Sequence, residues 1–294
     1  IYMNTIRGVA IRVVNDQSLY EILFDSRVKF FEQDQVGHTS SSSPPQDTSQ
    51  IVPTGIRRVI ENDQANANTD SSHVAHINDK KDKTSKITEN QKNTDVDIAI
   101  IDSGVNLVHP DLYVYRNVTF VNGTSSGNDD NGHGTQVAGI AAAKDDSMGI
   151  VGTAPGARIW SLKVCDKSGV CPVSSQIAAV DYATMYADQI DVANISIENP
   201  DSSAYINAIG KSVAAGITYT VAAGNSGRDA VSTSPANAPS VIAVSAIADS
   251  DGRCGGLGRP TVGGNDDTFA NFSNFGPVVD LSLIHISEPT RHLR

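Results

Sequence analysis

The chain has 294 residues, of which 39% are hydrophobic and 5% aromatic, as in a globular protein large enough to bury a sizeable core. Its 33 acidic residues outnumber its 22 basic ones, and the resulting net charge of -11 argues against nucleic acid and anionic membranes as partners. No apolar run approaches membrane-spanning length. Because the chain starts at Ile1 and shows no signal peptide, we expect its amino terminus to be incomplete.

The first 94 residues divide into three parts. Residues 1–36 alternate apolar and polar side chains in GVAIRVV and then follow helical spacing, which predicts a small α+β unit. Residues 37–48, VGHTSSSSPPQD, form a Ser/Pro linker that cannot bury a core and invites cleavage. The main domain, predicted over 49–280, carries a polar insertion at 57–94 that we expect to be an irregular surface segment.

From Asp95 onward, short Val- and Ile-rich runs alternate with helical patterns, which is typical of βαβ units around a buried parallel sheet. The predicted strands are DIAII, ARIWSLKV, VANISI, ITYTVAA and SVIAVSAI. The predicted helices are TQVAGIAAAK, AYINAIGKSVAAG and SSQIAAVDYATMYADQ, the last opened by a Ser cap. We therefore expect an α/β fold, with a parallel β-sheet flanked by helices in three layers.

Three polar residues are candidates for a functional site in such a fold. Asp102 and Asn225 each follow a predicted strand, and the carboxyl ends of parallel strands meet at one edge of a sheet. His133 stands between two glycines before a helix, and its imidazole suits a general base near neutral pH. Each signal alone is weak. Asp-Ser-Gly also occurs in aspartic proteases, a lone His is more often structural, and Asn-Ser-Gly is usually a turn.

Together, the segments IIDSGVNLVHPDL, HGTQVAG and VAAGNSG are far more specific. The chain resembles the subtilisin family of serine proteases from about residue 8 to residue 280. The resemblance implies that Asp102 orients His133, that His133 is the general base, and that Asn225 donates to the oxyanion of the tetrahedral intermediate. An aspartic protease would need a second Asp-Thr/Ser-Gly loop, and DSDG at 249–252 has the wrong spacing, so that alternative is rejected.

The serine nucleophile of the family lies in a Gly-Thr-Ser-Met-Ala segment, which this chain lacks. Ser125 follows a Gly-Thr pair but lies in a polar loop between Asp102 and His133, so we reject it. Where the family continues with Ala-Pro-Gly, the chain reads SLIHISEPTRHLR; this resembles a translated sequencing adapter, and we interpret 281–294 as an artefact. We expect the chain as given to be inactive and its parent to be a serine endopeptidase. The alternative is a non-catalytic binding protein with the subtilase fold.

The resemblance also implies how peptides bind. Residues 1–36 resemble the family's inhibitory propeptide, which implies a zymogen whose mature sequence starts around Ser49. Substrates in the family add as strands between two edges. Here the edges would be Gly169, Val170 and Cys171 on one side and Ser196, Ile197 and Glu198 on the other. The family usually has Gly where Glu198 stands; its carboxylate either favours Lys or Arg before the cleaved bond or points to solvent.

A structural calcium site is a further implication of the resemblance. Its ligands would be the side chains of Gln50, Asp111 and Asp146 and the carbonyl oxygens of Lys144, Met148 and Ile150. Calcium prefers such hard oxygen ligands. The alternative is an acidic turn, KDDSMG, that binds nothing.

The cysteines and sequons bear on the cellular compartment. Cys165 and Cys171 flank a Ser-Gly turn that would let them bridge, although reduced thiols remain an alternative, and the partner of Cys254 is open. Four sequons, at Asn117, Asn122, Asn194 and Asn271, are compatible with secretion and glycosylation. We expect a secreted monomer that binds polypeptide substrates and its own propeptide.

Overall fold

The computed structural model describes residues 2–6, 8–13, 19, 22, 25, 27–39, 94–146, 149–250 and 255–282. A seven-stranded sheet lies at the centre, with the strand order β13-β10-β8-β6-β2-β4-β3, and every neighbouring pair is parallel. Its strands are β2 (Asp97–Asp102), β3 (Tyr113–Thr119), β4 (Arg158–Lys163), β6 (Val192–Ile195), β8 (Thr218–Ala222), β10 (Ile242–Ser245) and β13 (Leu281–Ser282). Most of the predicted linker, the segment 49–93 and residues 283–294 lie outside the described residues.

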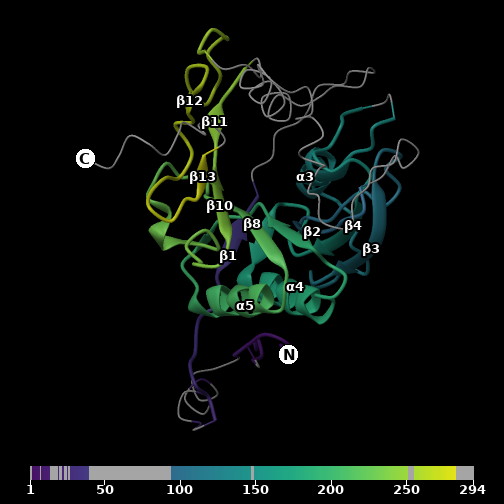
Figure 1. Cartoon of the computed structure of the whole chain (residues 1–294). Helices are drawn as coiled ribbons and strands as arrows, with labels where there is room; N and C mark the ends of the chain where they lie inside the picture. The colour runs from purple at the N-terminus through teal and green to yellow at the C-terminus, as the bar shows by residue number, and fades with distance from the viewer. Residues whose placement is uncertain are drawn as a thin grey trace.

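Helices cover both faces of this sheet. Figure 1 shows α4 (Val173–Met185) and α5 (Ser203–Ala214) side by side along one face, with α3 (His133–Ala142) on the other side. Successive side chains of a strand point to opposite faces, so Ala99 and Ile101 pack in the core with α4 and α5, whereas Ile98 and Ile100 pack with α3. All six residues of β2 are buried, as expected for a strand covered on both sides. The predicted three-layer α/β class is confirmed.

The predicted strands and helices are present with small shifts at their ends. β3 was missed, although its alternation of exposed Tyr113 and Tyr115 with half-buried Val114 is the pattern of an edge strand. The predicted Ser cap of α4 is wrong. Pro172 occupies the N-cap position, and the carboxylate of Asp34, from a distant part of the chain, accepts the Ser174 N–H instead (2.8 Å).

Shorter elements connect the layers at the edges of the sheet. They are β1 (Val36–His38), β5 (Val170–Pro172), β7 (Asn199–Pro200), β9 (Thr233–Ser234), β11 (Ile247–Ala248), β12 (Thr268–Phe269) and the 3-10 helix η2 (Ala230–Ser232). β1 pairs with β5, β7 with β9, and β11 with β12, all antiparallel.

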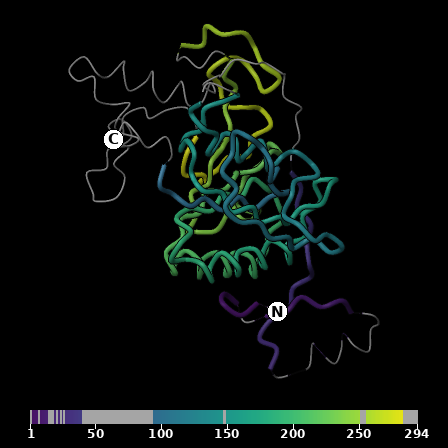
Figure 2. Tube along the Cα trace, turned by 90° about the vertical axis from the view of Figure 1, so that its right-hand side faces the viewer, coloured from purple at the N-terminus to yellow at the C-terminus, as the bar shows by residue number. Residues whose placement is uncertain are grey.

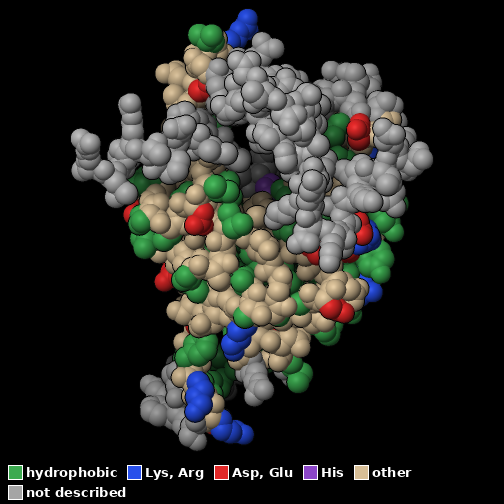
Figure 3. Space-filling view, viewed as in Figure 1, with side chains coloured by type: hydrophobic (Ala, Val, Ile, Leu, Met, Phe, Trp, Pro, Cys, Tyr) green, Lys and Arg blue, Asp and Glu red, His purple; other side chains and the backbone are tan. Residues whose placement is uncertain are grey.

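The described residues up to Thr39 form a segment on the outside of the sheet domain. Figure 2 shows this segment, in purple, passing beneath the layer of α4 and α5 before it rises toward the domain. Apart from the isolated bridge between Tyr2 and Gly8, the alternation in GVAIRVV forms no strand over the described residues 8–13. Phe30 and Phe31 are about half exposed. On the face shown in Figure 3, Lys and Arg side chains gather at the protruding lower end, and Asp and Glu are scattered over the rest.

Candidate active site

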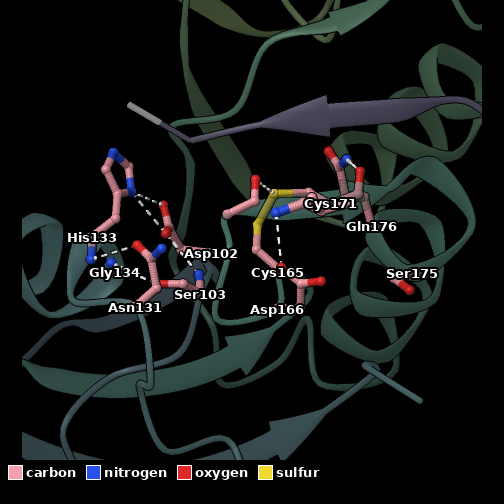
Figure 4. Close-up of a disulfide and its surroundings, with 12 residues drawn as sticks. Asp102, Ser103, Asn131, His133, Gly134, Cys165, Asp166, Cys171, Ser175 and Gln176 are labelled. Atoms are coloured by element: carbon pink, nitrogen blue, oxygen red, sulfur yellow. Dashed lines mark hydrogen bonds and ion pairs between the residues drawn. A yellow bond between two sulfur atoms is a disulfide. The ribbon is translucent and has the colours of Figure 1, made fainter. Parts of the chain in front are cut away.

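Asp102 and His133 form a hydrogen-bonded pair at the carboxyl end of β2. The Nδ1 atom of His133 lies 2.8 Å from Oδ1 and 3.0 Å from Oδ2 of Asp102. The Asp102 carboxylate is fully buried, and its Oδ1 also accepts the Ser103 N–H (2.7 Å). Figure 4 shows the ring of His133 with its second nitrogen turned away from Asp102. No described residue bonds this Nε2 atom, so the imidazole presents it outward as an acceptor when Nδ1 carries the proton.

Close backbone packing holds the pair in place. A Cβ atom at position 134 would lie 2.1 Å from the carbonyl oxygen of Gly104, so only glycine lets the first turn of α3 approach the end of β2. Asp129 sits in front of this helix and accepts hydrogen bonds from the backbone N–H groups of Gly132 and Thr135 (2.9 and 3.0 Å). Such a carboxylate satisfies the free N–H groups at a helix N-terminus.

Neighbouring charges favour the protonated form of His133. Burial lowers the pKa of the imidazole, but the hydrogen bond and charge of Asp102, together with the charge of Asp129, outweigh burial and raise the pKa above 6.5. The pair can therefore accept a proton on Nε2 and stabilise the resulting imidazolium.

A buried lysine supports the loop that follows Asp102. Lys163 is 1% exposed, and its Nζ donates to the carbonyl oxygens of Ser103 (2.6 Å) and Cys165 (2.9 Å) and to Asp130 (2.6 Å). A charged amine at this depth requires such partners. Neither Asp129 nor Lys163 was predicted as part of the site. Asp129 could have been, because an acidic residue just before a helix is a recognised signal of a helix start.

Asn225 follows β8 at the same edge of the sheet. The strand order β8-β6-β2 places it two strands from Asp102, in an exposed loop. The preceding Gly224 has a φ of 110°, a conformation that side chains rarely adopt. The Asn225 backbone N–H donates to the carboxylate of Glu198 (2.8 Å). Glu198 was expected to face either a substrate or solvent; its carboxylate instead contacts this loop, and its side chain is only 19% exposed.

The two predicted peptide-binding edges both contact the chain's own segment at 36–39. Gly37 and His38 of β1 pair antiparallel with Cys171 and Val170. On the other side, the His38 N–H donates to the carbonyl oxygen of Glu198 (3.2 Å). A Cβ atom on Gly37 would lie 2.0 Å from Oδ1 of Asn199, so this position accommodates no side chain without a shift. Ser196 and Ile197 precede Glu198 in the second edge.

A disulfide joins Cys165 to Cys171, which decides between the two predicted states of these residues. Figure 4 shows the disulfide beside the Asp102–His133 pair. Both sulfur-bearing residues are fully buried. The bond joins two positions six apart in the sequence and ties one peptide-binding edge to the chain just after β4. Cys254 lies outside the described residues.

Part of the predicted calcium site can be located. The Oδ1 atom of Asp111 accepts the Lys144 N–H (3.1 Å), and burial and the charge of Asp146 raise the pKa of Asp111. Ile150 also bonds the Asp111 carboxyl through its backbone N–H. Two neighbouring carboxylates, with the pKa of Asp111 raised, fit a cation. Gln50 and Met148 lie outside the described residues.

A second carboxylate cluster, at Asp249, Asp266 and Asp267, was not predicted. Asp266 accepts backbone N–H groups of Ser250 and Gly258, at 2.8 Å each, so it is engaged in holding its own loop.

None of the helices within the described residues is long and apolar enough to cross a membrane.

Comparisons with known proteins agree with this geometry. Residues 93–286 match the Subtilase family. Subtilisin DY of Bacillus licheniformis is 39% identical over 160 residues, which cover 53% of this chain and 58% of the relative. The minor extracellular protease Epr of Bacillus subtilis is 39% identical over 152 residues, covering 51% of this chain and 23% of the relative. The chain thus spans little more than half the length of Subtilisin DY.

A solved structure shares the fold. The crystal structure of a cold adapted subtilisin-like serine proteinase superimposes with a TM-score of 0.52 and 28% sequence identity, covering 70% of this chain and 69% of that one. With the matched family, the parallel sheet and the Asp102–His133 pair in hand, the conclusion is that this chain belongs to the subtilase family of serine proteases.

Proposed function

We propose that the protein to which this chain belongs is a serine endopeptidase in which Asp102 and His133 activate a serine that follows Asp280. The observation that carries the proposal is the geometry of the pair, with Nδ1 of His133 bonded to buried Asp102 and no described residue bonded to Nε2. Membership of the subtilase family supports it. The segment that would supply the serine is not found in residues 1–280, so the chain as given is expected to be inactive.

The proposed reaction has two halves, acylation and deacylation, each with two proton transfers through His133. Nε2 of His133 takes the proton of the serine hydroxyl as its oxygen attacks the carbonyl carbon of the peptide bond. Asp102 stabilises the imidazolium, and the side chain of Asn225 donates to the oxyanion. The imidazolium then passes the proton to the leaving amine, and water hydrolyses the acyl-enzyme by the same route.

A test requires the gene's own sequence beyond Asp280. The longer protein should hydrolyse peptides and react covalently with a fluorophosphonate, which labels activated serines. His133→Ala should lower kcat/KM by about 10⁴-fold or more, because serine proteases lose the general base with it. Asp102→Asn should also lower kcat/KM, because Asp102 orients His133. Its control is Asp188→Asn, which changes an exposed carboxylate without hydrogen-bond partners among the described residues. A longer protein that binds peptides but neither hydrolyses them nor reacts with the probe would favour the binding-protein alternative.

We further propose that residues 1–36, with the start of the linker that follows them, act as an inhibitory propeptide. The pairing of β1 with β5 and the bond from His38 to Glu198 support this, since a segment held there excludes a substrate strand. Gly37→Ala should weaken the inhibition and hasten the appearance of activity in the longer protein, because its Cβ atom would meet Asn199. Gly210→Ala is the matched control, since the nearest atom to a Cβ there is 3.8 Å away. Equal rates in the two variants would contradict the proposal.

A calcium ion near Asp111 and Asp146 would be a structural cofactor. The proximity of the two carboxylates and the raised pKa of Asp111 support it, and a bound cation would offset their repulsion. Removing calcium with a chelator should lower the Tm of the wild-type chain and leave the Tm of Asp111→Asn unchanged. A chelator that lowers both Tm values equally would exclude this site.

Secretion is supported by the Cys165–Cys171 disulfide, because such bonds persist in oxidising compartments. The printed name of the Epr relative, an extracellular protease, points the same way. Mass spectrometry of the protein from its native source would test both secretion and the four sequons.

A further inference from the structure

Glu198 contacts two parts of the candidate site at once. Its main-chain carbonyl oxygen accepts the His38 N–H on the peptide-binding edge (3.2 Å). Its side chain extends to the loop at 224–228, which carries Asn225. One residue therefore links the edge that binds a peptide to the loop that holds the proposed oxyanion donor.

The carboxylate of Glu198 is fully engaged in this loop. Oε2 accepts the Asn225 N–H (2.8 Å), and Oε1 accepts the Ser226 hydroxyl (2.7 Å). Oε1 also lies 3.2 Å from Nη2 of Arg228 and 3.3 Å from Nδ2 of Asn274. Hydrogen bonds to a charged acceptor are about twice as strong as those between neutral groups.

The loop itself has little apolar anchoring. Residues 225–228 are exposed, and Gly224 turns the chain with a φ of 110°. From the other side, Oδ1 of buried Asn274 accepts the backbone N–H groups of Ser226 and Arg228 (3.0 and 3.1 Å). Glu198 and Asn274 thus hold the loop between them, and the bond from Glu198 reaches the backbone of Asn225 itself.

The charges at Glu198 argue against a role in selecting basic substrates. Burial raises the pKa of the carboxyl, but the bonds from Ser226, Asn225 and Asn274 and the charge of Arg228 outweigh burial and lower the pKa below 4.5. The carboxylate is therefore ionised at neutral pH and already faces a cation. A substrate Lys or Arg would have to displace Arg228.

We propose that Glu198 is a positioning residue: it fixes the backbone of Asn225 and so directs the amide of that side chain toward the oxyanion. The second half of this statement rests on the proposed function of Asn225. The first half does not, because it concerns hydrogen bonds within this chain.

Hydrogen exchange tests the first half in the chain as it exists. Loss of a hydrogen bond to a charged group should make the Asn225 amide exchange about 10- to 100-fold faster in Glu198→Gly. Glu198→Gln, whose amide oxygen keeps one acceptor, should give an intermediate rate, and Asp188→Asn the wild-type rate. Amides of β2 that stay protected in every variant would show that the fold persists. An unchanged Asn225 exchange rate in Glu198→Gly would overturn the proposal.

Kinetics of the longer, nucleophile-bearing protein test the second half. Glu198→Gln should lower kcat by about 10-fold with KM nearly unchanged, because the donor to the oxyanion acts in the transition state. In an Asn225→Ala background, the same substitution should lower kcat no further. An equal loss in both backgrounds, or a rise in KM confined to substrates with Lys or Arg before the cleaved bond, would overturn the positioning role. If the wild-type longer protein shows no hydrolysis, the proposed function fails, and the exchange result alone decides what Glu198 does.

Discussion

The sheet domain and the segment at 2–39 are held in different ways. In the sheet, Ile100 and Trp160 are fully buried between helical layers, so burial of apolar side chains stabilises the fold. The segment buries Tyr2 in the core but leaves Phe30 53% exposed, and its other contacts are mainly carboxylate hydrogen bonds and the three-residue strand β1. Directional polar contacts can be broken one at a time. We therefore expect that the segment can be released without unfolding the sheet.

The largest expected effect is on the free energy of unfolding, when an apolar side chain is shortened in the sheet or in the segment. Ile100→Ala should lower the free energy of unfolding by about 2–5 kcal/mol, because it removes buried methyl groups from the sheet core and leaves a cavity. Phe30→Ala, at a half-exposed position in the segment, should change it by less than about 1 kcal/mol despite the larger side chain removed. Denaturant unfolding of the two variants measures both values. Similar losses would mean that the stretch around Phe30 is anchored by apolar burial as strongly as the sheet.

The second prediction concerns the contact at Asp181 on α4. Its carboxylate accepts the backbone N–H groups of Met3, Asn4 and Thr5, at 3.1, 2.7 and 2.7 Å. Burial raises the pKa of Asp181, but these donors outweigh it and lower the pKa below 3.8. A depressed pKa means that this stabilisation is present above pH 3.8 and is lost as the pH falls through the lower, folded value.

Asp181→Asn should therefore weaken the attachment of the segment by about 1.5–3 kcal/mol, the cost of losing a charged acceptor. Faster hydrogen exchange at Asn4 and Thr5, with unchanged exchange in β2, is the expected result. Asp188→Asn, at an exposed carboxylate just after the same helix, should change neither. Exchange that accelerates throughout the chain would instead make Asp181 part of the global fold.

The contrast between the regions also explains which features the sequence revealed. β2, β4, β6, β8 and β10 follow runs of Val and Ile because burial on both faces demands apolar side chains. Asp102 and His133 were found because their flanking glycines and strand ends are local signals. Asp34 at α4 and Asp181 at residues 3–5 were not found, because each contact joins positions more than a hundred residues apart. No local pattern marks such a pair.

The next largest effect is expected where the segment contacts the N-termini of two helices. Asp34 and Glu32 are two residues apart, and their carboxylates reach the starts of two neighbouring helices. Asp34 accepts the Ser174 N–H at the start of α4 (2.8 Å), and Glu32 accepts the Ala204 N–H at the start of α5 (3.1 Å). A carboxylate at a helix N-terminus satisfies free N–H groups and interacts favourably with the helix dipole.

Asp34→Asn and Glu32→Gln should each weaken the attachment by about 0.5–2 kcal/mol. Because both sites belong to one short stretch, the double variant should lose about the sum. Limited proteolysis of the segment measures its release. Asp25→Asn is the control, because the Asp25 carboxylate bonds only Arg27, two residues along the chain, among the described residues. Resistance to proteolysis that is unchanged in the double variant would contradict the proposed attachment.

The last expected effect is on the titration of His133 rather than on the attachment of the segment, because Asp102 is bonded to this imidazole. Asp102→Asn removes the charge that raises the pKa of His133, so the imidazole should titrate at lower pH, which NMR of the ring protons measures. In the wild type, the raised pKa stabilises the fold fully below pH 6.5, and this contribution is lost as the pH rises through the higher, folded pKa. The variant should lose most of that pH dependence, because only the charge of Asp129 would still raise the pKa. Because the imidazolium is what a general base must become, a His133 pKa that did not fall in Asp102→Asn would show that some other group supplies the proton affinity, and the assignment of Asp102 would have to be withdrawn.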